Sequence, residues 1–231
     1  AMKQIALDIG LAPGPSLANF LAGQNQLVLE HLSLWVSNQV RSPVPTYLWG
    51  EMGCGKTHLL QAVRAALGEQ GGLGSVGWMD PQLTEPGAFR EDWQVVLLDD
   101  VHLYNAVQQH AAFNWFVNAT SATDGQQRWV LASGAMPPSD LPVREDLRTR
   151  LAWGHVFQLQ LLSEIERRSV LRQHADARGL FLSDEVMDYL LHRFSRDLAS
   201  LMHWLDQIDR FALQSKRAIT VPLVREMMEQ L

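Results

Sequence analysis

The residues Gly50 to Thr57 have the types and spacing that could bind the phosphates of a nucleotide. They read GEMGCGKT and match the pattern G-x-x-x-x-G-K-[ST] at every fixed position. Gly53 and Gly55 would let backbone N–H groups converge on the β-phosphate without a Cβ in the way. Lys56 would reach the β- and γ-phosphates, and the Thr57 hydroxyl would ligate Mg²⁺. We therefore predict that the nucleotide is contacted by Gly50, Gly53, Cys54, Gly55, Lys56, Thr57 and His58.

Two acids further along the chain could complete this site. Four apolar residues, Val95 to Leu98, lead directly into Asp99 and Asp100. This is the expected end of a parallel strand whose carboxyl end faces the nucleotide. Asp99 would hold Mg²⁺ directly or through water, and Asp100 could orient or deprotonate an attacking water.

Two further polar groups are candidates, each with a plainer alternative. Ser133 ends the apolar run that begins at Arg128. At a strand tip its hydroxyl could touch the γ-phosphate or the attacking water, and a serine that only forms the turn is the alternative. The stretch VREDLRTR carries Arg144, Arg148 and Arg150. One of these arginines could stabilise charge on a transferred phosphoryl group, even in a neighbouring subunit, whereas an ordinary solvated basic face is the alternative.

The elements that must position these groups follow from periodicity. Short apolar runs predict strands at 46–49, 75–79, 95–98, 128–133 and 155–159. Amphipathic spacing predicts helices at 26–40, 58–67 and 105–119. From Ser163 onward, serine caps and glycine stops predict four helices and no strand. We therefore predict an α/β fold, in which an αβα parallel-sheet domain with the P-loop precedes a small all-helical domain. The predicted divisions are a flexible tail at 1–15, a nucleotide-binding domain at 16–160 and a helical lid at 161–231.

Composition excludes several classes of function. With 231 residues, 47% of them hydrophobic, the chain can bury a sizeable core, and its apolar runs are too short to cross a bilayer. We expect a cytoplasmic protein without a membrane partner. The single cysteine, Cys54, supports neither a disulfide framework nor a zinc site. A net charge of −6 disfavours a broad nucleic-acid surface, so we expect DNA to be engaged mainly through partners.

Residues 4–9, QIALDI, alternate polar and apolar side chains before a segment rich in glycine and proline. An exposed extended peptide of this kind can dock into a partner's groove. An edge strand or a disordered end is the alternative.

Together these motifs resemble the AAA+ ATPases, and within them the family of the bacterial initiator DnaA. The similarity is carried by GEMGCGKT, LLDDVHLYN, WVLASGAMPPSDLP and LRTRLAWG, and by the helical region that begins at FQLQLLSEIERR. It extends from Leu17 to the C-terminus and is greatest to the short, Hda-type members of the family. The resemblance implies phosphate contacts from Lys56 and Thr57, Mg²⁺ at Asp99, a trans arginine finger at Arg150 and a lid sensor arginine at Arg196.

The resemblance also implies a function. QIALDI is similar to the hexapeptide that binds the DNA polymerase sliding clamp, which implies contacts from Gln4, Leu7 and Ile9. Such a protein, holding ADP or ATP with Mg²⁺, would act with the DNA-loaded clamp to stimulate ATP hydrolysis by DnaA and so prevent re-initiation of replication. The relatives carry an aspartate and an arginine before the double proline, where this chain has Ala135 and Met136. We therefore expect weak or no ATPase activity of its own.

Alternatives stay open at this point. A DNA-associated ATPase of the helicase-loader type would act through its own ATP turnover. A small-molecule kinase would use the same phosphate loop, but the helical C-terminal domain and the absence of an acceptor-binding motif disfavour it. The sequence also leaves open a homo-oligomer and whether Ser133 replaces the missing sensor residue.

Overall fold

The computed structural model describes residues 15–18, 20–37, 44–121, 124–126, 128–194 and 198–230. Contacts divide the chain into two compact units. We call the first the sheet unit; it contains the residues through Phe20 together with Leu27–Trp49 and Gly55–Gln158. We call the second the helical unit; it contains Leu21–Gln26, Gly50–Cys54 and Leu159–Leu231.

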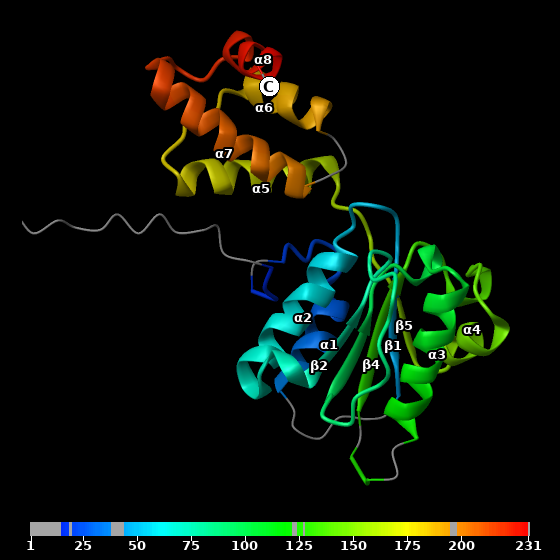
Figure 1. Cartoon of the computed structure of the whole chain (residues 1–231). Coiled ribbons are helices and arrows are strands. Elements are labelled where there is room, and N and C mark those ends of the chain that lie inside the picture. Colours follow the sequence, from blue (N-terminus) through cyan, green and yellow to red (C-terminus); the bar gives the residue numbers. More distant parts are fainter. Residues whose placement is uncertain are drawn as a thin grey trace, which may run out of the picture. The chain divides into compact units, whose positions relative to one another are not determined.

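The sheet unit is built on five parallel strands in the order β2-β3-β4-β1-β5 (Figure 1). Their bounds are β1 Thr46–Trp49, β2 Val76–Met79, β3 Val95–Leu98, β4 Trp129–Gly134 and β5 His155–Gln158. Every residue of β3 and β4 is buried, as expected for central strands that are covered on both faces. Because the strands are parallel, their carboxyl ends meet at one edge, where the predicted acids lie.

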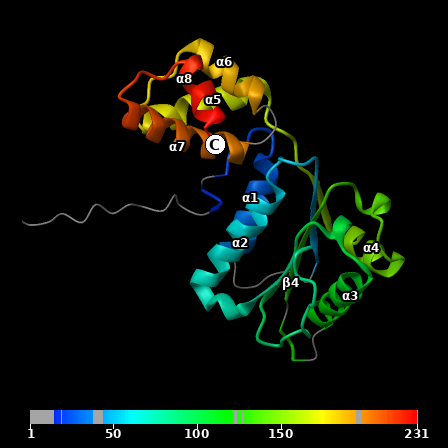
Figure 2. The ribbon, with the colours of Figure 1, turned by 45° about the horizontal axis from the view of Figure 1, so that its top comes forward.

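Helices cover both faces of this sheet. The helices α1 (Gln26–Ser37) and α2 (Lys56–Gly71) lie on one face, and α3 (Ala106–Thr120) and α4 (Glu145–Ala152) lie on the other (Figures 1 and 2). Single 3₁₀ turns complete the unit at Leu73–Ser75, Val101–Leu103 and Pro138–Asp140. The stripe of α1 that faces the sheet consists of Val28, Leu32 and Trp35, at the i, i+4, i+7 spacing of one helix face.

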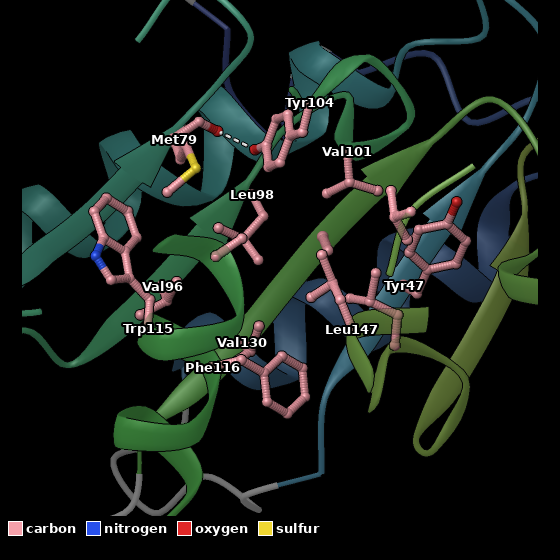
Figure 3. Close-up of a cluster of buried hydrophobic side chains, with 14 of the residues drawn as sticks. Tyr47, Met79, Val96, Leu98, Val101, Tyr104, Trp115, Phe116, Val130 and Leu147 are labelled. Carbon is pink, nitrogen blue, oxygen red and sulfur yellow. Dashed lines mark hydrogen bonds between the residues drawn. The ribbon is translucent and has the colours of Figure 1, made fainter. Parts of the chain in front are cut away.

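A buried cluster fixes α3 and α4 to their face of the sheet. Figure 3 shows Tyr47, Val96, Leu98 and Val130 from three strands gathered with Trp115, Phe116 and Leu147 from the two helices. The Tyr104 hydroxyl donates to the Met79 carbonyl oxygen at 2.9 Å within this cluster. The cluster therefore ties the chain that follows β3 to the end of β2, which fixes the strand ends that carry the acids.

The helical unit contains α5 (Glu164–Ala177), α6 (Asp184–Arg193), α7 (Leu198–Ser215) and α8 (Val221–Glu229). Ser163 caps α5, and with Glu166 it forms a capping box, as predicted from the sequence. The parallel sheet with its flanking helices and the following helices confirm the predicted fold class. Within the described part of the chain, none of the helices combines the length and the apolarity that a bilayer span requires.

Candidate nucleotide and metal site

The start of α2 presents backbone N–H groups that suit an anion. Gly53 and Gly55 have φ angles of 86° and 97°, in the left-handed region that favours glycine. Gly55 is the N-cap of α2 and supplies no side-chain hydrogen bond to it. The helix N-terminus therefore carries no side-chain cap, and the helix dipole favours a negatively charged ligand there.

Thr57 and Asp99 meet at this edge of the sheet. The Thr57 hydroxyl donates to Asp99 Oδ2 at 2.8 Å, which joins the first turn of α2 to the end of β3. Lys56, the residue before Thr57, is buried. A hydroxyl and a carboxylate that lie this close are the hard oxygen ligands that Mg²⁺ prefers.

These two residues fit magnesium that arrives with a nucleotide. Among the residues that the structure describes, no cluster of three or more His, Cys, Asp or Glu could hold a metal ion by itself. Mg²⁺ usually keeps several waters and takes only one or two protein carboxylates, with phosphate oxygens completing its shell. Thr57 and Asp99 would hold the ion in that way, and the ion would neutralise phosphate charge.

Asp99 is held on both of its carboxylate oxygens. The Ser133 hydroxyl donates to Oδ1 at 2.6 Å, opposite the bond from Thr57. Burial raises the pKa of Asp99 above its usual value, and the charges of Asp100 and Asp80 raise it further. The hydrogen bonds from Ser133 and Thr57 act in the opposite direction without cancelling that rise. A bound cation would favour the ionised carboxylate.

Asp100 has an unusual backbone conformation. Its φ and ψ are both 50°, left-handed for a residue with a side chain, and such a conformation costs about 1 kcal/mol or more. Its N–H donates to the Ser133 hydroxyl oxygen at 3.0 Å, and its carbonyl accepts from the Leu103 N–H at 3.0 Å. The acid predicted to orient water therefore lies on a strained turn that is fixed at both ends.

The segment before α1 packs on the start of α2. The Nε2 atom of His58 lies 3.1 Å from the Ser16 carbonyl oxygen, and the rings of Phe20 and His58 are 5.6 Å apart. A Cβ at Gly55 would lie 2.7 Å from Phe20 Cε2. His58, predicted to contact the nucleotide, is thus placed beside the phosphate loop with its ring nitrogen near the backbone of residue 16. Cys54 in the loop is buried and is not part of a disulfide.

Arg150 lies on α4, across the sheet from α2 (Figure 1). Its Cζ is 5.2 Å from the centre of the Phe113 ring on α3, and the Cζ of Arg144 is 5.4 Å from the same ring. Arg144 is paired with Asp146 at 2.6 Å. The Arg150 side chain makes no hydrogen bond or ion pair with any residue in the described part of the chain, and it lines an open hollow of about 1180 Å³ between α3 and α4.

The structure brings some predicted site residues together and leaves others apart. Thr57, Asp99 and Asp100 converge at one edge, joined by Ser133. Ser133 lies inside β4, so the interpretation of it as a turn-forming serine is wrong. Residues Gln4, Leu7, Ile9 and Arg196 lie outside the described residues.

Sequence reasoning missed two residues that contact the predicted site residues or the turn that follows β4. Tyr47 donates to the Met136 carbonyl oxygen at 2.7 Å and so holds the turn after β4. Phe113 lies under Arg150. Both have the apolar spacing of core residues, and only the packing of separate elements reveals their contacts.

Family models match two parts of the chain. The model described as the lid domain of Hda matches residues 164–228, and the model described as the bacterial DnaA ATPase domain matches residues 13–76. A Haemophilus influenzae protein, described only as uncharacterized, is 33% identical over 234 residues, which cover 98% of each chain.

Solved structures share the fold. Domain III of the Thermotoga maritima replication initiation protein DnaA aligns with a TM-score of 0.74 at 18% identity, covering 96% of this chain and 98% of that one. AMPPCP-bound DnaA from Aquifex aeolicus aligns with a TM-score of 0.66 at 24% identity, covering 86% of this chain and 66% of that one. That relative's nucleotide is an ATP analogue.

Proposed function

Because the chain belongs to the DnaA-related AAA+ proteins with an Hda-type lid, we propose that it is a nucleotide-bound adaptor. With the DNA-loaded sliding clamp it stimulates ATP hydrolysis by the initiator DnaA and so prevents re-initiation of chromosome replication in the cytoplasm. The proposal includes a clamp-binding tail at 1–15, a nucleotide-binding domain at 16–160 and a lid at 161–231.

The polar groups at the edge of the sheet support nucleotide binding. The start of α2 offers N–H groups for the β-phosphate, and Lys56 supplies a positive charge beside them. Thr57 and Asp99 have the oxygen ligands that a magnesium nucleotide uses. In this proposal ADP or ATP is held with Mg²⁺, and Arg196 of the lid contributes a further cation to its phosphates.

The environment of Arg150 is the observation that most directly supports the proposed adaptor function. Its guanidinium rests on an aromatic ring, in an open hollow and without an ion-pair partner among the described residues. An arginine finger needs such a side chain, because it stabilises charge that develops on another molecule's phosphoryl group. Arg150 would be inserted across the interface, next to the ATP held by DnaA.

The deciding assay is initiator ATP hydrolysis with clamp, DNA and this chain. The purified chain alone should turn over ATP negligibly, whereas its addition should accelerate hydrolysis by DnaA. Arg150→Ala should abolish that acceleration, because arginine fingers contribute about 10³- to 10⁵-fold to hydrolysis. Nucleotide affinity of the chain should stay unchanged.

Arg144→Ala is the matched control for this test. Arg144 shares the Phe113 ring but is paired with Asp146, so its loss should leave most of the acceleration. Weakened nucleotide binding in Arg150→Ala would instead show that the residue does not act in trans.

The proposed clamp contact has its own test. Replacing Gln4 and Leu7 together with alanine should remove binding to the clamp in a pull-down or surface-plasmon experiment, while nucleotide affinity is retained. Full clamp affinity in this double variant would contradict the assignment of the tail.

A second candidate is favoured by Asp100. The chain keeps an acid where the attacking water would be oriented, as a self-sufficient ATPase of the helicase-loader type requires. Vigorous ATP turnover by the chain alone, lost in Asp100→Asn, would establish this candidate and displace the adaptor.

A further inference from the structure

Ser133 links the two acids of the site. Its side chain is completely buried in β4, with an exposed fraction of 0%. Its hydroxyl donates to Asp99 Oδ1 at 2.6 Å and accepts the N–H of Asp100 at 3.0 Å. One hydroxyl therefore fixes the carboxylate of the first acid and the backbone of the second.

These two bonds leave Ser133 unsuited to sense a γ-phosphate. A serine hydroxyl has a single hydrogen, and here that hydrogen lies on the bond to Asp99. A phosphate oxygen is an acceptor, so contact with it would require Ser133 to release the buried carboxylate. That release would leave one oxygen of the buried carboxylate without its donor, which is energetically costly.

The positions after Ser133 offer no replacement. A Cβ at Gly134 would clash with the Tyr47 hydroxyl oxygen, so this position excludes a side chain. The next two residues, Ala135 and Met136, carry no hydrogen-bond donor in their side chains. Tyr47 also donates to the Met136 carbonyl oxygen at 2.7 Å, which fixes this turn. The end of β4 therefore holds the acids and supplies no side-chain donor to a third phosphate.

We propose that Ser133 is a positioning residue for magnesium, which acts through Asp99 and Asp100 and does not sense the γ-phosphate. It sets the orientation of the Asp99 carboxylate and holds Asp100 in its left-handed conformation. The contribution of Ser133 to the Mg²⁺ dependence of nucleotide affinity is then the same for a diphosphate as for a triphosphate. This inference rests on the magnesium nucleotide site of the proposed function.

The test measures the binding of fluorescent ADP and ATP to the full chain while Mg²⁺ is titrated. Mg²⁺ should increase nucleotide affinity, and the measured quantity is the Mg²⁺ concentration at half of that increase. In Ser133→Ala this concentration should rise about 10- to 100-fold, the usual effect of removing a residue that orients a metal ligand. The rise should be equal for ADP and ATP. Affinity in EDTA should match that of the unchanged chain.

Ser75→Ala is the matched control for lost stability. Ser75 is also buried, and its hydroxyl donates to the Gly72 carbonyl oxygen at 2.7 Å, away from the acids. Both variants should lower the melting temperature in EDTA, but only Ser133→Ala should change the Mg²⁺ dependence.

Three outcomes overturn the inference. Loss of ATP affinity alone, with ADP unaffected, would make Ser133 a γ-phosphate sensor. A lowered melting temperature with unchanged Mg²⁺ dependence would reduce it to a structural residue, while the proposed function stands. Absence of nucleotide binding in the unchanged chain would remove the proposed function and this inference with it.

Discussion

Replacing Gly55 with alanine should destabilise the sheet unit through two separable effects. The first is backbone conformation, because Gly55 has a φ of 97°. The second is a clash, because the added Cβ would lie 2.7 Å from Phe20 Cε2, where carbon atoms normally stay about 3.5–4.0 Å apart. Residue 55 is thus restricted to glycine by Phe20 as well as by its backbone conformation.

The magnitude follows from these two effects. A left-handed backbone costs alanine about 1–2 kcal/mol, and overpacking adds about 1–3 kcal/mol. The free energy of unfolding should therefore fall by about 2–5 kcal/mol in Gly55→Ala. Gly125 supplies the matched control, since its φ is 74° and nothing lies within 4 Å of an added Cβ. Gly125→Ala should cost only the conformational part, about 1–2 kcal/mol.

Urea unfolding without nucleotide, followed by tryptophan fluorescence, measures both losses apart from any effect on ligand binding. A double variant isolates the clash, since Phe20→Leu removes the ring. In that background Gly55→Ala should cost no more than Gly125→Ala. Equal losses at Gly55 and Gly125 in the unchanged chain, or a cost at Gly55 that persists without the Phe20 ring, would refute the reasoning.

Two further predictions concern other parts of the chain. The pKa of His31 is lowered to about 4, mainly by burial and to a smaller extent by the charge of His155. The stability that comes with its neutral ring is therefore fully present above pH 6.5 and is lost as the pH falls towards 4. For a half-buried ring the loss of unfolding free energy is about 1–2 kcal/mol. The variant His31→Gln should remove this pH dependence between pH 6.5 and 4, whereas the control His192→Gln, at an exposed position, should keep it. The side chain of Asn25 makes hydrogen bonds of 2.9 and 2.7 Å to the backbone of Gln160. Asn25→Ala should therefore lower the free energy of unfolding of the helical unit, measured in urea, by about 2 kcal/mol. A loss below about 0.5 kcal/mol would contradict this prediction.

The parts of the site that depend on local chain were predictable from the sequence. The glycine loop, Lys56 and Thr57 lie within a single turn of chain, so their spacing alone specifies a strand, a loop and a helix start. Asp99 was predictable for the same reason, since a parallel strand of four apolar residues must deliver the next residue to the carboxyl edge.

The contact between Ser133 and Asp99 was not predictable in this way. It depends on the register of β3 with β4, where Leu98 pairs with Ala132, so that the next residues of the two strands are brought side by side. A single sequence does not encode that register in any short pattern. The predicted strand also ended at Ser133, whereas β4 continues to Gly134.

The same limit applies to Arg150 and Phe113. Their contact needs α3 and α4 to pack on the same face of the sheet, and the helix periodicity predicts each helix without its neighbour. Likewise, the left-handed turn at Asp100 depends on the hydrogen bond that its N–H makes to another strand. Aspartate tolerates this conformation better than most residues but seldom adopts it without such support.

Hydrogen-bond partners distinguish the groups that we propose to hold a nucleotide from Arg150, which we propose to act on the nucleotide of another molecule. The oxygens of Asp99, the backbone of Asp100 and the hydroxyl of Ser133 are each committed to a neighbour in the sheet unit. In the proposed site, these bonds would oppose any rearrangement of the acids when a triphosphate is replaced by a diphosphate. The guanidinium of Arg150, in contrast, rests on the Phe113 ring and makes no ion pair with a described residue. Since a guanidinium binds carboxylates and phosphates, Arg150 is the side chain that we propose to meet a phosphate of another molecule at the hollow between α3 and α4.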